Sequence, residues 1–597
     1  DPQLHQLPTK DCVIDETMNR CCLLELPSAV LGMYWPAERV MAGLRVCKSI
    51  RKELLEHTGT IIVAKTPGAS VGTDLFAADF WQERRRKVCL TWRGEPHLLQ
   101  YLEPLAPCLS HLDVKDTVLG GIGVRGLAKV VRTCTVLRHL DLSGAGIDHD
   151  GMERLAGRLG QCTALAHLDL SWNRIMRDGT HHLTLVLEQC EVLAHLNLSG
   201  NSIGAEGAGV LAEVLGECNA LTHLDLTCNQ LGDEGVRWLC GGLGECASLV
   251  HLELSSNEIG AEGAELLGGV LGECKALAHL GLSHNLIGND GAGNLVGVLV
   301  GCKALAHLVL NSNRIDDAGV GRLAAVMGQC TALVHLGLSG NRFGDQGAAS
   351  LAEGLQGCKE LGFLDLSRNG IGDEGAEKLA ATLGGCKELK HLDLSNNGIG
   401  ADAVGKLAGV LGECNKALAH LGLSGNRIGD QGAGNLERVL KECKALVRLE
   451  LSSNEIDEAG VRRLALVLGE CTSLVHLDLS DNRVGDDGVT RLVGGLVRCE
   501  SLVNLNLNQN GIGNKGVERL AKALVGCKAL LHLDLSQNWI EEAGMRRLAE
   551  VRRQWPRGRK ELLVDLSDQT QTYRQRYRHR HRHTQTQNNV WMAWGAA

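Results

Sequence analysis

The sequence is poor in aromatic residues and has no long apolar run. Only 3% of its 597 residues are Phe, Trp or Tyr, so aliphatic side chains must fill the interior. No run of roughly 18 consecutive apolar residues occurs, which argues against a transmembrane helix and a membrane partner. The formal net charge of −9 is small for this length, and this balance does not favour nucleic acid as a partner.

The cysteines lack the spacing of a disulfide-bonded secreted domain. Fifteen of the 23 form one series, at intervals of 28 residues with a single interval of 29, from Cys134 to Cys527. Secreted frameworks concentrate paired cysteines in short domains, whereas one thiol per unit suits a small buried hydrophobic residue. We therefore expect reduced thiols and a cytoplasmic or nuclear protein.

A repeat of 28 residues dominates the chain. The chain contains sixteen units, of which the first starts at Leu109. One extra residue interrupts the period near 415–416, and a divergent last strand follows at 562–567. Each unit reads L-x-x-L-x-L-x-x-N-x-I-x-x-x-G-x-x-x-L-x-x-x-L-x-x-C. Self-similarity at this period is typical of a solenoid, in which neighbouring units bury a shared core.

The spacing of the leucines predicts one strand and one helix per unit. Leu196 and Leu198 are two apart and point to the same side of a strand. Leu211 and Leu215 are four apart and share one face of a helix. Asn occupies the ninth position in fourteen of the sixteen units, where its amide can satisfy backbone groups of the loop.

These units resemble the leucine-rich repeat, and their length resembles its ribonuclease-inhibitor-like class. The resemblance covers about three-quarters of the chain, residues 109–567. It implies an α/β solenoid shaped as a horseshoe, with parallel strands on the concave face and helices on the convex face. It also implies a monomeric, non-enzymatic protein without a cofactor that binds another protein on the concave face.

Three polar positions recur along the predicted concave face. His precedes the second strand leucine in thirteen units, an acid or Asn usually follows two residues later, and Ser two after that, as in His167, Asp169 and Ser171. We expect all three to face outward. A catalytic triad needs one shielded site, which a copied ladder does not offer. A polar ladder kept by duplication, a weak metal site and a pH-responsive binding face remain alternatives.

Departures from the repeated pattern mark the predicted contact surface. In three nearby units, Gly281, Val309 and Gly337 stand at the position where most units carry an acid. Elsewhere in the array occur aromatic and arginine residues, the types that commonly anchor interfaces. Random drift within a duplicated array is the alternative. The predicted partner-binding residues are Trp172, His279, His307, Val309, His335, Phe363, Arg368, Arg448 and Glu450.

The segment before the repeats resembles an F-box at residues 21–58. The matching residues are Leu26, Pro27, Val30, Leu31, Glu38, Val40, Leu44, Val46, Cys47 and Lys48, although Ile50 stands where that family often has Trp. A helical cap over the first repeats is the alternative. Residues 1–20 are expected to be a disordered leader, and 59–108 a cap or degenerate repeats that include a strand at 87–92. Residues 568–597 are expected to form a disordered, basic, histidine-rich tail.

The two resemblances together imply a substrate-recruiting adaptor of a ubiquitin ligase. The repeats would hold the target, and a Skp-family adaptor would bind Leu26, Pro27, Val46, Cys47 and Ile50. Two other classes stay open. One is a small-GTPase regulator resembling Ran GTPase-activating proteins, and the other is an inhibitor, scaffold or immune-receptor-like repeat protein.

Overall fold

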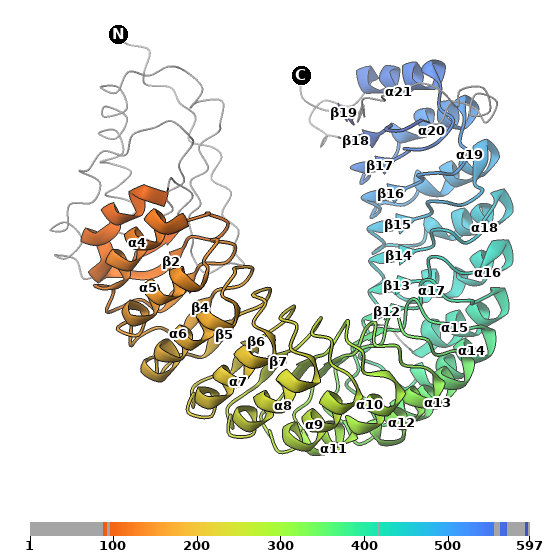
Figure 1. Cartoon of the computed structure of the whole chain (residues 1–597). Helices are drawn as coiled ribbons and strands as arrows, with labels where there is room; N and C mark the ends of the chain where they lie inside the picture. Colours follow the sequence, from red (N-terminus) through yellow and green to blue (C-terminus); the bar gives the residue numbers. More distant parts are fainter. Residues whose placement is uncertain (1–87, 92–95, 415–416, 555–561, 570–590, 595–597) are drawn as a thin grey trace, which may run out of the picture. The chain divides into compact units, whose positions relative to one another are not determined.

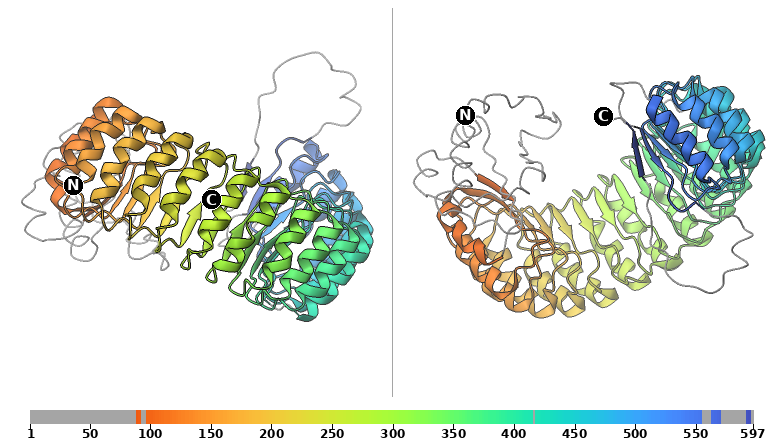
Figure 2. Two further views of the ribbon diagram at one scale, coloured as in Figure 1. Left: turned by 60° about the horizontal axis from the view of Figure 1, so that its bottom comes forward. Right: turned by 90° about the horizontal axis from the view of Figure 1, so that it is seen from above.

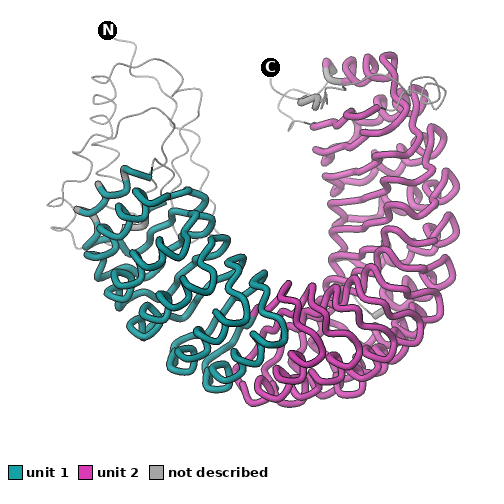
Figure 3. The backbone as a smooth tube through the Cα atoms, viewed as in Figure 1, with its two compact units in different colours: residues 1–252 teal, residues 253–597 magenta. Residues whose placement is uncertain are grey.

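The computed structural model describes residues 88–91, 96–414, 417–554, 562–569 and 591–594. The chain divides into two compact units, residues 1–252 and 253–597, which Figure 3 distinguishes by colour. The division falls inside strand β7 (His251–Glu253). Both units are built from the predicted strand–helix repeat (Figure 1). No helix within the described ranges has the length and apolar character needed to cross a membrane.

Unit 1 contains a parallel sheet in which each strand pairs with the next one along the chain. Equivalent residues face each other, so His139 pairs with His167 and Asp141 with Asp169. The strands are β1 (Val88–Thr91), β2 (Leu109–Asp113), β3 (His139–Asp141), β4 (His167–Asp169), β5 (His195–Asn197) and β6 (His223–Asp225). The helices are the 3₁₀ helix η2 (Pro96–Cys108) and α4 (Gly120–Val131), α5 (His149–Leu159), α6 (Met176–Gln189), α7 (Gly204–Leu215) and α8 (Gly232–Leu243).

Unit 2 repeats this arrangement with the same register. Its further strands are β8 (His279–Gly281), β9 (His307–Val309), β10 (His335–Gly337), β11 (Phe363–Asp365), β12 (His391–Asp393), β13 (His420–Gly422), β14 (Arg448–Glu450), β15 (His476–Asp478), β16 (Asn504–Asn506), β17 (His532–Asp534), β18 (Leu562–Asp565) and β19 (Trp591–Trp594). Its helices are α9 (Ala261–Leu271), α10 (Gly288–Asn294), α11 (Val296–Gly301), α12 (Asp317–Met327), α13 (Asp345–Leu355), α14 (Asp373–Leu383), α15 (Ala401–Cys414), α16 (Gly429–Asn435), α17 (Glu437–Glu442), α18 (Glu458–Leu468), α19 (Gly485–Leu496), α20 (Asn514–Leu524) and α21 (Glu542–Gln554).

In each unit the strands form one layer and the helices the other (Figures 1 and 2). The repeated leucines of both layers are buried. Leu196, Leu198 and Leu211 are at most 2% exposed, as the spacing predicted. The glycine that recurs in the motif is also required for a steric reason. A Cβ on Gly207 would lie 2.7 Å from Ile203 Cγ2 and 3.3 Å from Arg177 Cα, so consecutive helices pack closely only with glycine there.

An asparagine ladder joins each repeat to the one before it. Asn229 Oδ1 accepts from the backbone N–H groups of Asn201 and Ile203, one repeat earlier. Its Nδ2 donates to the carbonyls of Leu198 and Leu226, so one side chain spans two loops. The same pattern recurs in unit 2, for example at Asn454. These fully buried amides supply the hydrogen bonds that the interior loops would otherwise lack.

Two further ladders join neighbouring helices. In unit 2, Asp345 Oδ1 accepts from the N–H groups of Gly372 and Gly375 at 2.7 and 2.8 Å, so an acid at the start of one helix caps the start of the next. At the other helix end, the thiol of Cys330 donates to the Leu299 carbonyl at 3.1 Å. In unit 1, the thiol of Cys246 makes the same bond to the carbonyl of Leu215, 31 residues earlier, at 2.9 Å.

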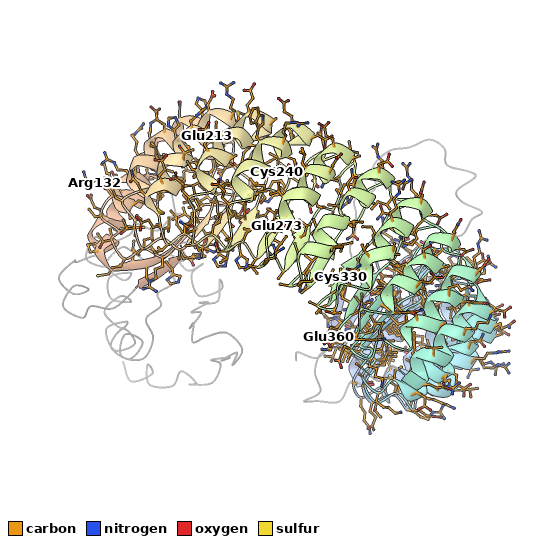
Figure 4. The ribbon with its side chains drawn as sticks, turned by 90° about the horizontal axis from the view of Figure 1, so that it is seen from below. Arg132, Glu213, Cys240, Glu273, Cys330 and Glu360 are labelled. Carbon is orange, nitrogen blue, oxygen red and sulfur yellow. The ribbon has the colours of Figure 1, made fainter. Side chains whose placement is uncertain are left out.

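The cysteine series is therefore structural in the described residues. All its described members are buried except the partly exposed Cys218, while Cys414 is outside the described side chains. Cys240 and Cys330, labelled in Figure 4, are both buried. Burial raises the pKa of the Cys190 thiol to about 11 and that of Cys162 to about 12. A protonated thiol is a poor nucleophile and metal ligand, which disfavours a redox or metal-binding role for these cysteines.

The asparagine ladder continues across the extra residue near 415–416 and ends with a glutamine in place of asparagine. Ile399 N donates to Asn426 Oδ1 at 3.1 Å although the separation there is 27 residues instead of 26. At the last unit Gln569 takes the place of asparagine, since its Oε1 accepts from Ile540 N. At the other end, β1 pairs with β2 and η2 packs on α4, as a strand and helix of one further unit would. The tail was predicted to be disordered, but Trp591–Trp594 forms β19, antiparallel to β18.

Replacing Asn229 by Ala should destabilise unit 1 by about 2–3 kcal/mol, because several buried backbone groups lose their partner. The matched control is Asn219→Ala, an exposed residue in the loop before β6. Urea denaturation followed by circular dichroism measures both. Equal midpoints for the two variants would contradict a stabilising role for the ladder.

Candidate binding surface on the strand face

The first and third residues of each strand form one surface, here called the strand face. Their side chains are mostly half-buried between the neighbouring strands. The first residues stack ring on ring along each unit. Ring centroids are 4.1 Å apart for His139–His167 and for His195–His223 in unit 1. In unit 2, Phe363 lies 4.0 Å from both His335 and His391, with its ring nearly parallel to theirs.

Stacking keeps several of these histidines neutral. Burial, together with neighbouring imidazoles, lowers the pKa of His167, His335 and His391 to about 4. Burial also lowers the pKa of His139, His307, His420 and His476. A group with a pKa near 4 does not change charge near neutral pH. The hypothesis of a binding face that switches near neutrality is therefore wrong for the three most shifted histidines.

The acidic row has a local structural role. Asp169 Oδ1 accepts from both the N–H and the hydroxyl of Ser171, at 2.8 and 2.6 Å. The same pair of bonds forms between Asp365 and Ser367. This arrangement is an Asx turn that closes the chain after the strand.

The sequence predicted an outward-facing serine row, but the serine is buried at several of its positions. Ser171 is only 5% exposed and Ser367 7%. Strand β4 ends at Asp169, so the alternation of sides stops before Ser171 is reached. The hydrogen-bond order also differs from a catalytic triad, since the serine donates directly to the aspartate while the histidine stacks on other rings.

Glycines in the acidic row open space for the preceding repeat. A Cβ on Gly281 would lie 1.8 Å from Glu253 Oε2, so the glycine makes room for that carboxylate. Glu253 reaches His279, with 2.5 Å between Oε1 and Nε2. These two side chains are potential ligands for a divalent cation.

The structure brings one group of predicted residues together. His279, His307, His335 and Phe363 are the first residues of the adjacent strands β8–β11. Val309 is the third residue of β9, and its pairing partners on both sides are glycines, Gly281 and Gly337. A branched apolar side chain therefore stands beside positions that carry no side chain.

The other predicted residues are not strand residues of that group. Arg368 follows β11 in left-handed conformation, with φ +54°. Arg448 and Glu450 share β14, with 3.4 Å between Nη1 and Oε1. The F-box-like residues Leu26, Pro27, Val46, Cys47 and Ile50 lie outside the described residues.

Trp172 belongs to unit 1 and is 64% exposed. It adopts φ +54°, a left-handed conformation that is costly for a bulky residue. Gly144 and Gly200 occupy the equivalent positions in the neighbouring repeats, and a Cβ on Gly200 would lie 2.7 Å from the Trp172 ring. The ring therefore lies over the glycine of the next repeat.

Sequence reasoning missed the space beside Gly422, the third residue of β13. It lies between Asp393 of β12 and Glu450 of β14 in the sheet. A Cβ at that position would lie 2.5 Å from Asp393 Oδ1. The available signal was the glycine itself, in a position where the adjacent repeats carry acids.

Comparisons with known proteins identify the repeat. The sequence profile of the Leucine Rich repeat matches eleven segments: 133–156, 189–212, 217–240, 245–268, 329–352, 361–380, 385–408, 414–436, 470–493, 498–521 and 526–549. No curated protein matches the sequence. A leucine-rich repeat protein of Leptospira interrogans is 19% identical, with 67% of this chain and 97% of that chain covered and a TM-score of 0.41. An internalin of Listeria monocytogenes is 19% identical, with 66% and 87% covered and a TM-score of 0.34.

Lowering the pH should destabilise the fold through the stacked histidines. The folded pKa of His391 is about 4, below the ordinary value of 6.5, so stability present above pH 6.5 is lost as the pH falls toward 4. His391→Phe keeps a flat ring in the stack, as Phe363 does next to it, and removes one titrating group. Thermal melts should show a smaller loss of midpoint between pH 7 and 4 than in the wild type. An identical loss in both proteins would contradict a neutral His391.

Proposed function

Because this chain is a leucine-rich repeat protein, we propose that it binds a protein partner through the strand face of unit 2 around β8–β11. One observation carries the proposal. Four adjacent strands present a row of rings, and Val309 projects beside them between two glycines. Rings that carry no charge, such as those of Phe363 and His335, lose little hydration energy when a partner covers them, and aromatic residues commonly anchor interfaces.

The finer assignments rest on the sequence. The 28-residue period and helices of 11 or more residues in most units favour the ribonuclease-inhibitor-like class. The F-box-like segment favours a substrate-recruiting adaptor, in which Leu26, Pro27 and Val46 contact a Skp-family protein together with Cys47 and Ile50. In that role residues 109–567 hold the substrate.

Phe363→Ala and Arg368→Ala should each lower retention of the partner about tenfold, the typical loss for an interface anchor. Trp172→Ala should leave retention unchanged, because it lies in unit 1. The matched control is Leu466→Ala, which removes an apolar side chain that is 65% exposed on helix α18. Affinity purification with quantitative mass spectrometry compares the four variants. Loss of the same proteins from Trp172→Ala alone would place the contact in unit 1 and contradict the proposal.

A purified Skp-family adaptor should be retained by the intact protein and lost on Leu26→Ala combined with Pro27→Ala. These residues lie outside the repeats, so partner binding at Phe363 serves as the control for folding. If the intact protein retains no Skp-family adaptor, the ubiquitin-ligase role fails. A GTP-hydrolysis assay with added small GTPases then tests the regulator alternative.

A further inference from the structure

A notch in the strand face of unit 2 surrounds Gly422. The notch is formed by Asp393 of β12, Ser395 in the turn after it, Gly422 of β13 and Glu450 of β14. The Asp393 carboxylate extends into the room that a side chain on Gly422 would take. A Cβ on Gly422 would lie 2.5 Å from Asp393 Oδ1 and 3.0 Å from Ser395 Oγ.

Ser395 is unusual among the serines of this row. It is 6% exposed, and its hydroxyl has no hydrogen-bond partner among the residues that the structure describes. In the preceding repeat, Ser367 Oγ donates to Asp365 Oδ1 at 2.7 Å, whereas Asp393 accepts only from the Ser395 N–H. A buried hydroxyl without a partner costs free energy unless a ligand supplies one.

The Glu450 carboxylate also does not accept the hydrogen bond that would close the turn after its own strand. The N–H of Ser452 donates instead to Ser424 Oγ at 3.2 Å. The Glu450 carboxylate lies 3.4 Å from the Arg448 guanidinium on the same strand and 3.9 Å from His420 Nε2. Such a long, half-exposed ion pair stabilises the protein very little, and Glu450 remains able to bind another cation.

The atoms around the notch are hydrogen-bond acceptors of negative or neutral charge. Two carboxylates and one serine hydroxyl oxygen lie around this position, and the guanidinium of Arg448 lies beside the Glu450 carboxylate. A guanidinium carries five N–H donors and an ammonium carries three, each with a positive charge. Burial keeps His420 uncharged by lowering its pKa, so it adds no repulsion near neutral pH.

We propose that this notch binds the cationic side chain of an arginine or lysine in a basic segment of the protein partner. The inference rests on the protein-binding function proposed above and names the chemistry of the partner. The segment crosses the strands along the acidic row, where Asp365 and Asp478 flank the notch on β11 and β15. Arg448 competes for Glu450 and is not itself a contact for the partner.

The test uses the full-length protein and a fluorescein-labelled dodecapeptide of alternating arginine and serine. A lysine–serine peptide and a glutamine–serine peptide are the comparison probes. Fluorescence anisotropy should detect the two basic peptides, with weaker binding at higher salt. Asp393→Asn combined with Glu450→Gln should weaken their binding at least tenfold. Glu360→Gln combined with Glu388→Gln changes the net charge equally at two exposed loop sites and should have no effect (Figure 4 labels Glu360).

Two variants separate the notch from a general attraction to acids. Gly422→Asp adds a negative charge but fills the space, so it should weaken binding, whereas general attraction predicts stronger binding. Arg448→Ala should strengthen binding because it removes the competing guanidinium. Weaker binding in Arg448→Ala, or stronger binding in Gly422→Asp, would overturn the proposal.

Ser395→Ala provides a test that does not depend on charge. It should weaken peptide binding and leave the melting temperature unchanged or higher, since the hydroxyl has no partner within the protein. The matched variant Ser367→Ala breaks the bond to Asp365, so it should lower the melting temperature without affecting the peptide. Equal binding by the wild type and Ser395→Ala would count against the notch.

Other occupants give distinct results. A thermal shift with 1 mM CaCl₂, on the order of weak extracellular calcium sites, without any peptide binding would identify a cation site and refute the proposal. If Phe363→Ala abolishes partner retention while the Asp393 and Glu450 changes have no effect, the strand-face function stands and the notch proposal fails. If neither set affects the partner, both proposals fail.

Discussion

The fold depends on one side-chain amide that bonds to the backbone of two repeats. Short strands leave loops whose N–H and carbonyl groups are turned toward the interior, away from water. Asn229 satisfies groups from its own loop and from the preceding one, so neither loop is satisfied without its neighbour. The helix caps of Asp345 and the thiol bond of Cys330 apply the same principle at the two helix ends. Leucine burial then supplies the main stabilisation, about 1.5–3 kcal/mol per side chain.

The period and the type of each element could be predicted from the leucines. Their spacing distinguishes a strand from a helix, as Leu196 and Leu211 illustrate, and burial follows from the need to stack. The partners of the polar residues could not be predicted in the same way. Ser171 was assigned to the outer face by continuing the strand alternation, but the strand stops two residues earlier and the chain turns inward.

The strand face illustrates why residue type alone does not fix charge. Histidine ordinarily titrates near neutrality, so thirteen copies left a pH-responsive face as one of the alternatives. Stacking replaces water around His335 and His391 with other rings, which penalises the charged form. The face therefore presents uncharged rings at positions such as His335 and His391, beside acids that are partly engaged in turns. The space at Gly422 was invisible in the sequence because its character depends on Asp393 and Ser395 of the preceding repeat.

The ladder bonds also determine how the repeat region can change in length. Within each unit, an amide, a cap or a thiol bonds to the equivalent residues one period away. A duplication or deletion of one whole period, wherever it starts, therefore joins equivalent donors and acceptors again. Gain or loss of half a period would place a strand beside a helix and leave all three ladders open. Recombination between repeats can thus lengthen or shorten the binding surface in whole steps while the interior remains hydrogen-bonded.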